Sequence, residues 1–161
     1  MEDFQNLIFQ AKKTISAADH MLIMTFPLVK DPKILLAVLS STFSALTNAT
    51  DSLVTYERVF KRIPPPQDTF ESKFNVFKDQ ISKRYNINSE YIKLILEIKE
   101  ILNTHKKSPI EFSRNDRFII CTENYRMKTI SVEELKKYIA KTKMYITEIE
   151  RLVNKNAGIF K

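Results

Sequence analysis

The sequence contains a single glycine, Gly158, which lies close to the C-terminus of the 161-residue chain. Loops that cradle phosphate groups and turns that bind dinucleotides need glycine where the backbone approaches the ligand closely. The scarcity of glycine therefore argues against both kinds of nucleotide-binding fold, and we expect no bound cofactor. Gly158 itself suits the end of a last helix.

Cysteine is equally scarce, because Cys121 stands alone. No intrachain disulfide can form, so nothing in the sequence points to secretion. The first four residues, Met1 to Phe4, include two acids and show no signal-peptide pattern. We therefore expect a cytoplasmic protein, in which Cys121 is a small buried hydrophobic side chain.

Charge is missing from Ile34 to Thr50, inside a longer stretch, 33–62, that contains neither glycine nor proline. This run has about the minimum length that a helix needs to span a membrane, and several hydroxyl side chains dilute it. We expect a buried central helix and no transmembrane segment. A second face of this helix carries small side chains that would allow close approach of a neighbouring backbone or homo-oligomerisation: Ala37, Ser40, Ser41, Ser44, Ala45 and Asn48.

Apolar residues at three- and four-residue steps predict a mainly α protein, with one domain over 1–161. Phe26-Pro27 is expected to end the first helix and Asp31-Pro32 to begin the second. So short a connection makes these two long helices antiparallel neighbours, packed with three shorter ones. The predicted helices cover about 2–25, 33–62, 68–85, 88–105 and 131–155.

The segment from about 108 to 130 interrupts the helical pattern. Arg117–Thr122 is rich in β-branched and aromatic residues, and Tyr125–Ile130 alternates between apolar and polar residues. Glu123-Asn124 can form the turn between them. We therefore predict a β-hairpin insert before the last helix.

Ser131 and Glu134 form a capping box at the start of the last helix. The helical pattern that follows directs Leu135, Tyr138, Ile139, Ile146, Ile149 and Leu152 inward and Lys136, Lys137, Lys141 and Lys143 outward.

The net charge of +7 is concentrated in the last third of the chain, where residues 105–161 hold thirteen basic against seven acidic residues. A basic region attracts RNA, DNA, anionic lipid or an acidic protein, although it can also be a solvated surface without function. Phe112 and Tyr125 add aromatic surface that can stack on bases. The candidate binding surface comprises His105, Lys106, Lys107, Arg114, Arg117, Arg126, Lys128, Lys136 and Lys137.

Two other places carry chemically capable residues. Asp19 and His20 are adjacent, but neighbouring residues on a helix point in different directions. Because no Glu-x-x-His pair occurs, the di-metal pattern of helical bundles is missing and no metal is expected. Glu57-Arg58 lies near the end of the long helix, where the cations Lys61 and Arg62 suit the helix dipole. We assign no catalytic residue.

The helical segments over roughly 1–105 resemble the HEPN group of small α-helical bundles, many of which act on or near RNA. The characteristic motif of that group is an arginine followed, after four residues, by a histidine. Ile15 and Glu100 stand where that arginine would precede His20 and His105. The stretch from Ser108 to Arg114 is also similar to small uncharacterised archaeal helical proteins.

Together these features favour a non-catalytic binding module that contacts RNA or an acidic protein through its basic last third. One alternative is an RNA-acting enzyme of HEPN type that uses His105 with Glu111 or Arg114. The other is a structural subunit that oligomerises through the small-residue face of the long helix, which a large exposed apolar patch would favour.

Overall fold

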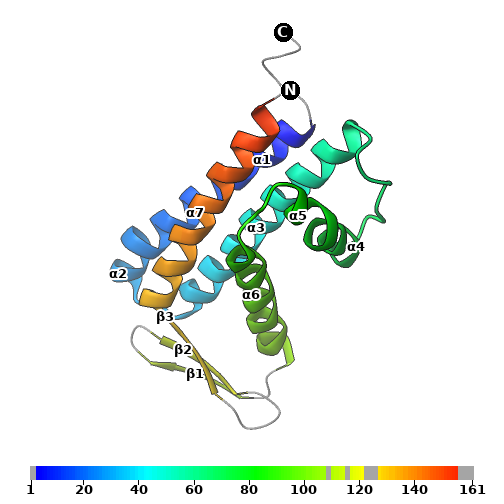
Figure 1. Cartoon of the computed structure of the whole chain (residues 1–161). Helices are drawn as coiled ribbons and strands as arrows, with labels where there is room; N and C mark the ends of the chain where they lie inside the picture. The colour runs from blue at the N-terminus through cyan, green and yellow to red at the C-terminus, as the bar shows by residue number, and fades with distance from the viewer. Residues whose placement is uncertain (1–2, 108–109, 115–116, 122–126, 156–161) are drawn as a thin grey trace.

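The computed structural model describes residues 3–107, 110–114, 117–121 and 127–155. The protein is mainly α-helical, with a small antiparallel sheet before the last helix, which confirms the predicted fold class (Figure 1). Two π-helical turns join shorter helices into longer continuous rods. The elements are α1 (Asp3–His20), the π-turn η1 (Met21–Thr25), α2 (Phe26–Val29), α3 (Lys33–Val59), α4 (Phe70–Val76), the π-turn η2 (Phe77–Ile81), α5 (Ser82–Arg84), α6 (Ser89–Lys107), β1 (Ile110–Arg114), β2 (Arg117–Cys121), β3 (Met127–Ser131) and α7 (Val132–Asn154).

Helix α3 runs through the middle of the bundle, as the charge-free run predicted. Helices α1 and α7 pack along one side of it, and α4 and α6 contact the other side (Figure 1). Leu35, Leu39 and Leu46 of this helix are fully buried. Among the described residues, no helix combines the length and apolar character needed to cross a membrane.

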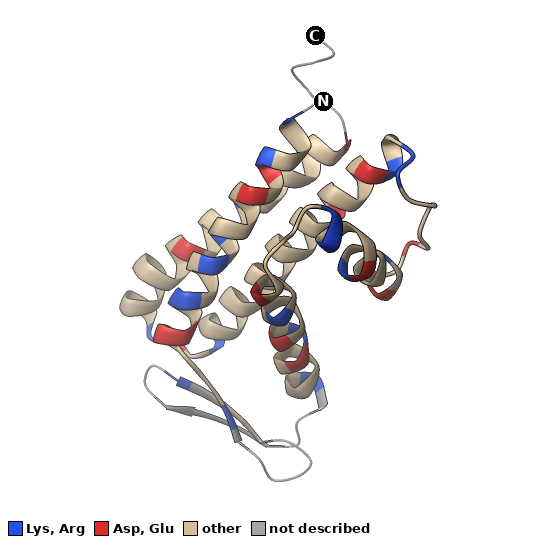
Figure 2. Cartoon of the chain, viewed as in Figure 1, with Lys and Arg blue, Asp and Glu red and all other residues tan. Residues whose placement is uncertain are grey.

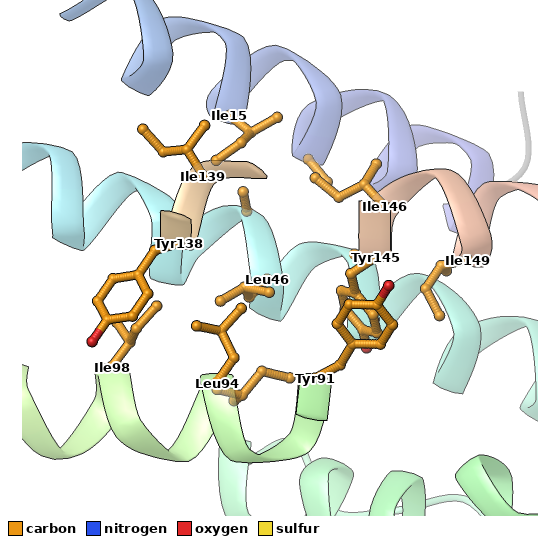
Figure 3. Packing of buried hydrophobic residues seen from close by; sticks show 14 of the residues in the cluster. Ile15, Leu46, Tyr91, Leu94, Ile98, Tyr138, Ile139, Tyr145, Ile146 and Ile149 are labelled. Atoms are coloured by element: carbon orange, nitrogen blue, oxygen red, sulfur yellow. The ribbon is translucent and has the colours of Figure 1, made fainter. Parts of the chain in front are cut away.

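The core lies where α1, α3, α6 and α7 meet (Figure 3). Ile15, Leu46 and Ile146 converge there from three different helices. Tyr145 of α7 is also buried, and its hydroxyl lies 2.7 Å from Thr50 Oγ1 of α3. Each apolar side chain of this size stabilises the fold by roughly 1.5–3 kcal/mol when it is fully buried. Burial in this region therefore holds α1, α6 and α7 against α3.

The first helical rod does not end at Phe26-Pro27, as the sequence had predicted. The π-turn η1 leads directly into α2, and the Phe26 N–H donates to the Met21 carbonyl across the wider turn. Pro27 therefore occupies the first turn of a new α-helical segment, where its missing N–H is tolerated. The rod ends instead at Lys30, whose φ of 57° is left-handed.

The sheet contains one strand more than the predicted hairpin. Strands β2 and β3 pair antiparallel as predicted, and β1 pairs with the other edge of β2. Ile120 and Ile130 are buried where β2 meets α3 and β3 meets α7. The predicted turn at Glu123-Asn124, like Gly158, lies outside the described residues.

The capping interaction at the start of α7 is present. Ser131 Oγ accepts a hydrogen bond from the Glu134 N–H at 3.2 Å. The predicted stripe of this helix is buried except for Leu152, which is partly buried. The four lysines of the opposite face are exposed. The stretch 131–155 therefore behaves as its local pattern predicts.

Candidate functional site

The predicted basic surface is spread over the end of α6, the sheet and the start of α7. His105 is partly buried and Lys106 is exposed near the end of α6, which Lys107 closes. Arg117 is exposed at the start of β2, and Arg114 closes β1. Arg126 lies outside the described residues.

Two cations of the predicted surface form ion pairs in the part of the chain that the structure describes. Lys128 Nζ lies 3.7 Å from Glu97 Oε1, and Lys136 Nζ lies 3.8 Å from Glu133 Oε1. Figure 2 shows acidic and basic positions following one another along α7. Exposed pairs of this kind contribute little to stability, about 0–1 kcal/mol each. They do, however, reduce the net positive potential of this face. Lys137 is also exposed on α7.

The other two lysines of the predicted outward face are paired with distant parts of the chain. Lys141 Nζ lies 3.9 Å from Glu90 Oε2 of α6, and Lys143 binds Asp19 of α1. Two lysines of the last third are thus paired with acids from the first two thirds of the chain.

A denser group of basic side chains forms where α3 and α5 end. Both helices close with a left-handed residue, Lys61 at φ 57° and Asn86 at φ 52°. The Arg62 N–H donates back to the Glu57 carbonyl at 2.9 Å, and the Ile87 N–H donates to the Ser82 carbonyl at 2.8 Å. This is the Schellman pattern of a helix C-terminus. The C-terminal ends of α3 and α5 lie close together here.

The carboxylate of Glu57 joins the two helix ends. Its side chain is 0% exposed. Arg84 Nη1 donates to Glu57 Oε2, and the Tyr85 hydroxyl donates to Oε1. Arg62 Nη1 lies 3.6 Å from Oε1 and donates to the Tyr85 hydroxyl at 3.0 Å. Both carboxylate oxygens therefore have charged or hydroxyl partners, which a buried charge requires. We call Glu57, Arg62, Arg84 and Tyr85 the guanidinium cluster.

The cluster changes the acidity of its phenol. Burial, followed by the hydrogen bond to Glu57 and the negative charge of that carboxylate, raises the pKa of Tyr85 to about 12. The hydroxyl consequently stays protonated above pH 10 and keeps its bond to Glu57 there.

The guanidinium cluster is open to solvent on its cationic side. The side chains of Arg62 and Arg84 are 37% and 39% exposed. The Arg62 guanidinium carbon also lies 5.3 Å from the centre of the Phe60 ring, so the group is stacked as well as hydrogen-bonded. Figure 2 shows basic positions on the ends of both α3 and α5.

Three further exposed cations directly adjoin cluster residues in the sequence, and we call them its rim: Arg58, Lys61 and Lys83. Cluster and rim hold five basic residues against the single carboxylate of Glu57. The positive excess here is larger than on the paired face of α7.

The sequence pointed to Glu57 and Arg58 but did not reveal their setting. Glu57 is buried, whereas Arg58 is exposed and belongs to the rim. One signal was available, because Glu57 lies on the apolar stripe of the long helix, four residues after Leu53 and three before Phe60. A carboxylate at a buried position needs partners, but the sequence does not show that Arg84 and Tyr85 supply them.

A second candidate is a cleft of about 540 Å³ between α3, α4 and α6. The small side chains Ser40 and Thr47 lie on its α3 wall, and Ser40 is exposed. The predicted close approach of a neighbouring helix fails at Ala37, Ser40 and Ser44, which are exposed, whereas Ala45 of the same face is buried and Ser41 and Asn48 are partly buried. This part of α3 is left open because α6 contacts α3 less extensively than α1 does.

The charges in this cleft largely compensate one another. Lys73 Nζ lies 3.7 Å from Asp51 and 2.8 Å from Asp68, and burial raises the pKa of Asp51. Lys99 Nζ sits 4.3 Å from the centre of the Phe70 ring. Lys106, a member of the predicted basic surface, also lines the cleft. The cleft can hold a small polar molecule, but it carries less positive charge than the guanidinium cluster and its rim taken together.

Comparison with known protein families, with curated proteins and with solved structures finds no match for this chain. The resemblance to HEPN bundles therefore stays a prediction. His20 ends α1 and is exposed. Within the described ranges, no group of three or more His, Cys, Asp or Glu side chains is arranged to hold a metal ion.

Proposed function

We propose that the protein is a non-catalytic binding module for single-stranded RNA, and that the guanidinium cluster and its rim contact the RNA. One observation carries this proposal: the buried carboxylate of Glu57 holds two partly exposed arginines at the meeting point of two helix ends. Single-stranded RNA supplies both the phosphates and the bases for which this surface has partners.

Phosphate groups fit the arginines by geometry as well as by charge. A planar guanidinium presents several N–H donors in a fixed fork, which matches the oxygens of a phosphate. Arg84 is fixed by Glu57 and by its Nη2 contact of 3.4 Å with the Arg62 carbonyl. Because these side chains are already ordered, little conformational entropy is lost when a ligand binds.

Bases fit the aromatic groups at the edge of the same surface. Phe60 and Tyr85 are both partly buried, and Arg62 contacts both of them. Its guanidinium lies over the Phe60 ring and donates a hydrogen bond to the Tyr85 hydroxyl. Unpaired bases stack on aromatic rings and on guanidinium planes, and each stacked base contributes roughly 1–3 kcal/mol. This combination favours a single strand over a duplex, whose bases are stacked inside.

The proposal is tested by the salt dependence of binding to a labelled single-stranded oligoribonucleotide. The variant Arg58→Gln/Lys61→Gln/Lys83→Gln removes the rim and leaves the Glu57 contacts intact. If all three cations contact phosphates, the slope of log K against log salt becomes shallower by about 2, from about 0.7 per contact on a single strand. Affinity at low salt should fall with it.

The matched control is Lys128→Gln/Lys136→Gln/Lys137→Gln, which removes the same charge from the surface that the sequence predicted. Its slope should stay close to that of the wild type. An equal or larger change in the slope of the control variant would show that the RNA binds to the sheet and α7 instead. Failure of the wild-type protein to bind RNA at low salt would overturn the proposal, and cleavage of the oligonucleotide would replace it with an RNA-acting enzyme.

A further inference from the structure

Four large apolar side chains project into solvent at the junction of α1, η1 and α2. Leu28 is 84% exposed, and Ile23, Met24 and Val29 are each half exposed or more. We call these four residues the apolar tip. Soluble proteins rarely expose large apolar side chains side by side without a binding role, so the apolar tip needs an explanation that the RNA surface does not supply.

The local backbone explains how these residues reach the surface. The stretch Met21–Val29 contains no charged residue, and Leu22 and Phe26 anchor it in the core. A π-turn holds more residues than an α-turn and frequently marks functional positions. Within η1, Ile23 and Met24 are exposed while Leu22 is buried.

The rod then stops abruptly. The Lys30 N–H donates to the Phe26 carbonyl at 2.7 Å, and the left-handed Lys30 reverses the chain. Leu28 and Val29 are therefore left at the end of the bundle, where α2 lies at the edge of the molecule (Figure 1). The apolar tip is a projection and not a groove.

Basic residues flank the apolar tip. Lys30 and Lys33 are exposed next to it, and Asp31 lies between them. The Asp31 carboxylate accepts a hydrogen bond from the Lys33 N–H at 3.0 Å, at the start of α3. The ammonium groups of Lys30 and Lys33 thus lie beside the apolar tip. The one carboxylate between them, that of Asp31, is hydrogen-bonded to the backbone.

We infer that the apolar tip docks onto the surface of a lipid bilayer that contains anionic lipids. The apolar side chains would enter the boundary between headgroups and acyl chains, and Lys30 and Lys33 would contact the headgroup phosphates. A bilayer accepts a projecting tip without a complementary groove. Charge complementarity with the lysines selects an anionic surface over a neutral one.

This site is separate from the guanidinium cluster. The apolar tip precedes the first turn of α3, and Glu57 lies in its last turn, so about 40 Å of helix separates them at 1.5 Å per residue. A protein docked through the apolar tip would present the guanidinium cluster away from the bilayer.

The experiment is cosedimentation with vesicles of phosphatidylcholine, with and without phosphatidylserine, in the absence of RNA. We expect the wild type to sediment with the phosphatidylserine vesicles. The variant Met24→Ser/Leu28→Ser should require at least about tenfold more lipid for the same bound fraction, because two side chains lose their apolar burial. Lys30→Gln/Lys33→Gln should weaken binding severalfold on phosphatidylserine vesicles.

The control is Phe9→Ser/Met144→Ser, which changes two other exposed apolar side chains, 53% and 63% exposed, on α1 and α7. Its lipid binding should match the wild type. All the substituted side chains face solvent, so circular dichroism should show the wild-type helix content in each variant.

Two results would overturn the inference. One is a wild type that does not sediment with anionic vesicles. The other is a dimer in sedimentation velocity that Met24→Ser/Leu28→Ser abolishes, which would assign the apolar tip to a second copy of the chain. Because RNA takes no part, neither result bears on RNA binding through the guanidinium cluster.

Discussion

Glu57 illustrates how a single buried charge can organise a surface. Its carboxylate is withdrawn from water and compensated by Arg84, Tyr85 and Arg62 from two helix ends. Removing one partner of a buried pair usually costs far more than the pair contributes, because the remaining groups lose their compensation. Because the two arginines are partly exposed, water can replace some of the hydrogen bonding that they lose when the Glu57 carboxylate is removed.

We therefore expect Glu57→Gln to lower the free energy of unfolding by about 2–4 kcal/mol, measured by chemical denaturation. The control is Glu97→Gln, which removes an exposed carboxylate paired with Lys128 and should change stability by less than about 1 kcal/mol. Equal effects of the two substitutions would mean that the cluster does not depend on its buried charge.

Tyr85 makes part of this stability dependent on pH. Its pKa is 10.0 in the unfolded chain and about 12 in the folded protein. The protonated phenol is thus favoured by folding, and its contribution is complete below pH 10 and is lost as the pH rises from 10 to about 12. Partial exposure limits this contribution to about 1 kcal/mol.

The measurement compares wild type with Tyr85→Phe in denaturant titrations across this alkaline range. Wild type should be the more stable protein at neutral pH, and the difference should shrink as the pH rises through the pKa of Tyr85. A difference that stays constant would show that the phenol does not titrate differently in the folded protein.

At the scale of elements, three rods end with a left-handed residue that is not glycine: Lys30, Lys61 and Asn86. Asparagine tolerates this conformation, whereas lysine is disfavoured there because its Cβ crowds the following carbonyl. The lysines are retained at a cost in stability, and both lie on surfaces to which we assign binding.

Lys61→Gly should accordingly raise the free energy of unfolding by about 0.5–1 kcal/mol, since glycine adopts positive φ without strain. Lys83→Gly is the matched control, because Lys83 lies inside α5. That substitution should lower stability by a similar amount. If both substitutions raised the free energy of unfolding, or if neither did, the strain assigned to the left-handed Lys61 would be contradicted.

Elements specified by neighbouring residues could be predicted from the sequence. The stripe of α7 and the cap at Ser131 were found because a helix places residues three and four apart on one face. The continuation of the first rod through Pro27 was missed, because it depends on a π-turn that the apolar pattern does not reveal. Strand β1 was missed because strands are stabilised by pairing across the sheet more than by their own residues.

At the scale of the whole molecule, charge could be counted along the sequence but not placed. Lys143 of the basic last third pairs with Asp19, which lies 124 residues before it. The guanidinium cluster joins Glu57 to Arg84, 27 residues later in the chain. Both arrangements result from the packing of rods on α3, and a sequence pattern carries no direct record of that packing.

The central claim is that RNA contacts the surface built around Glu57. The most direct test is a heteronuclear NMR titration of isotope-labelled protein with a single-stranded oligoribonucleotide, which reports the backbone amides that sense the ligand. We predict the largest shift changes in residues 57–62 and 83–86. Changes centred instead on 105–107, 117, 128 and 136–137, or no changes at all, would contradict the claim.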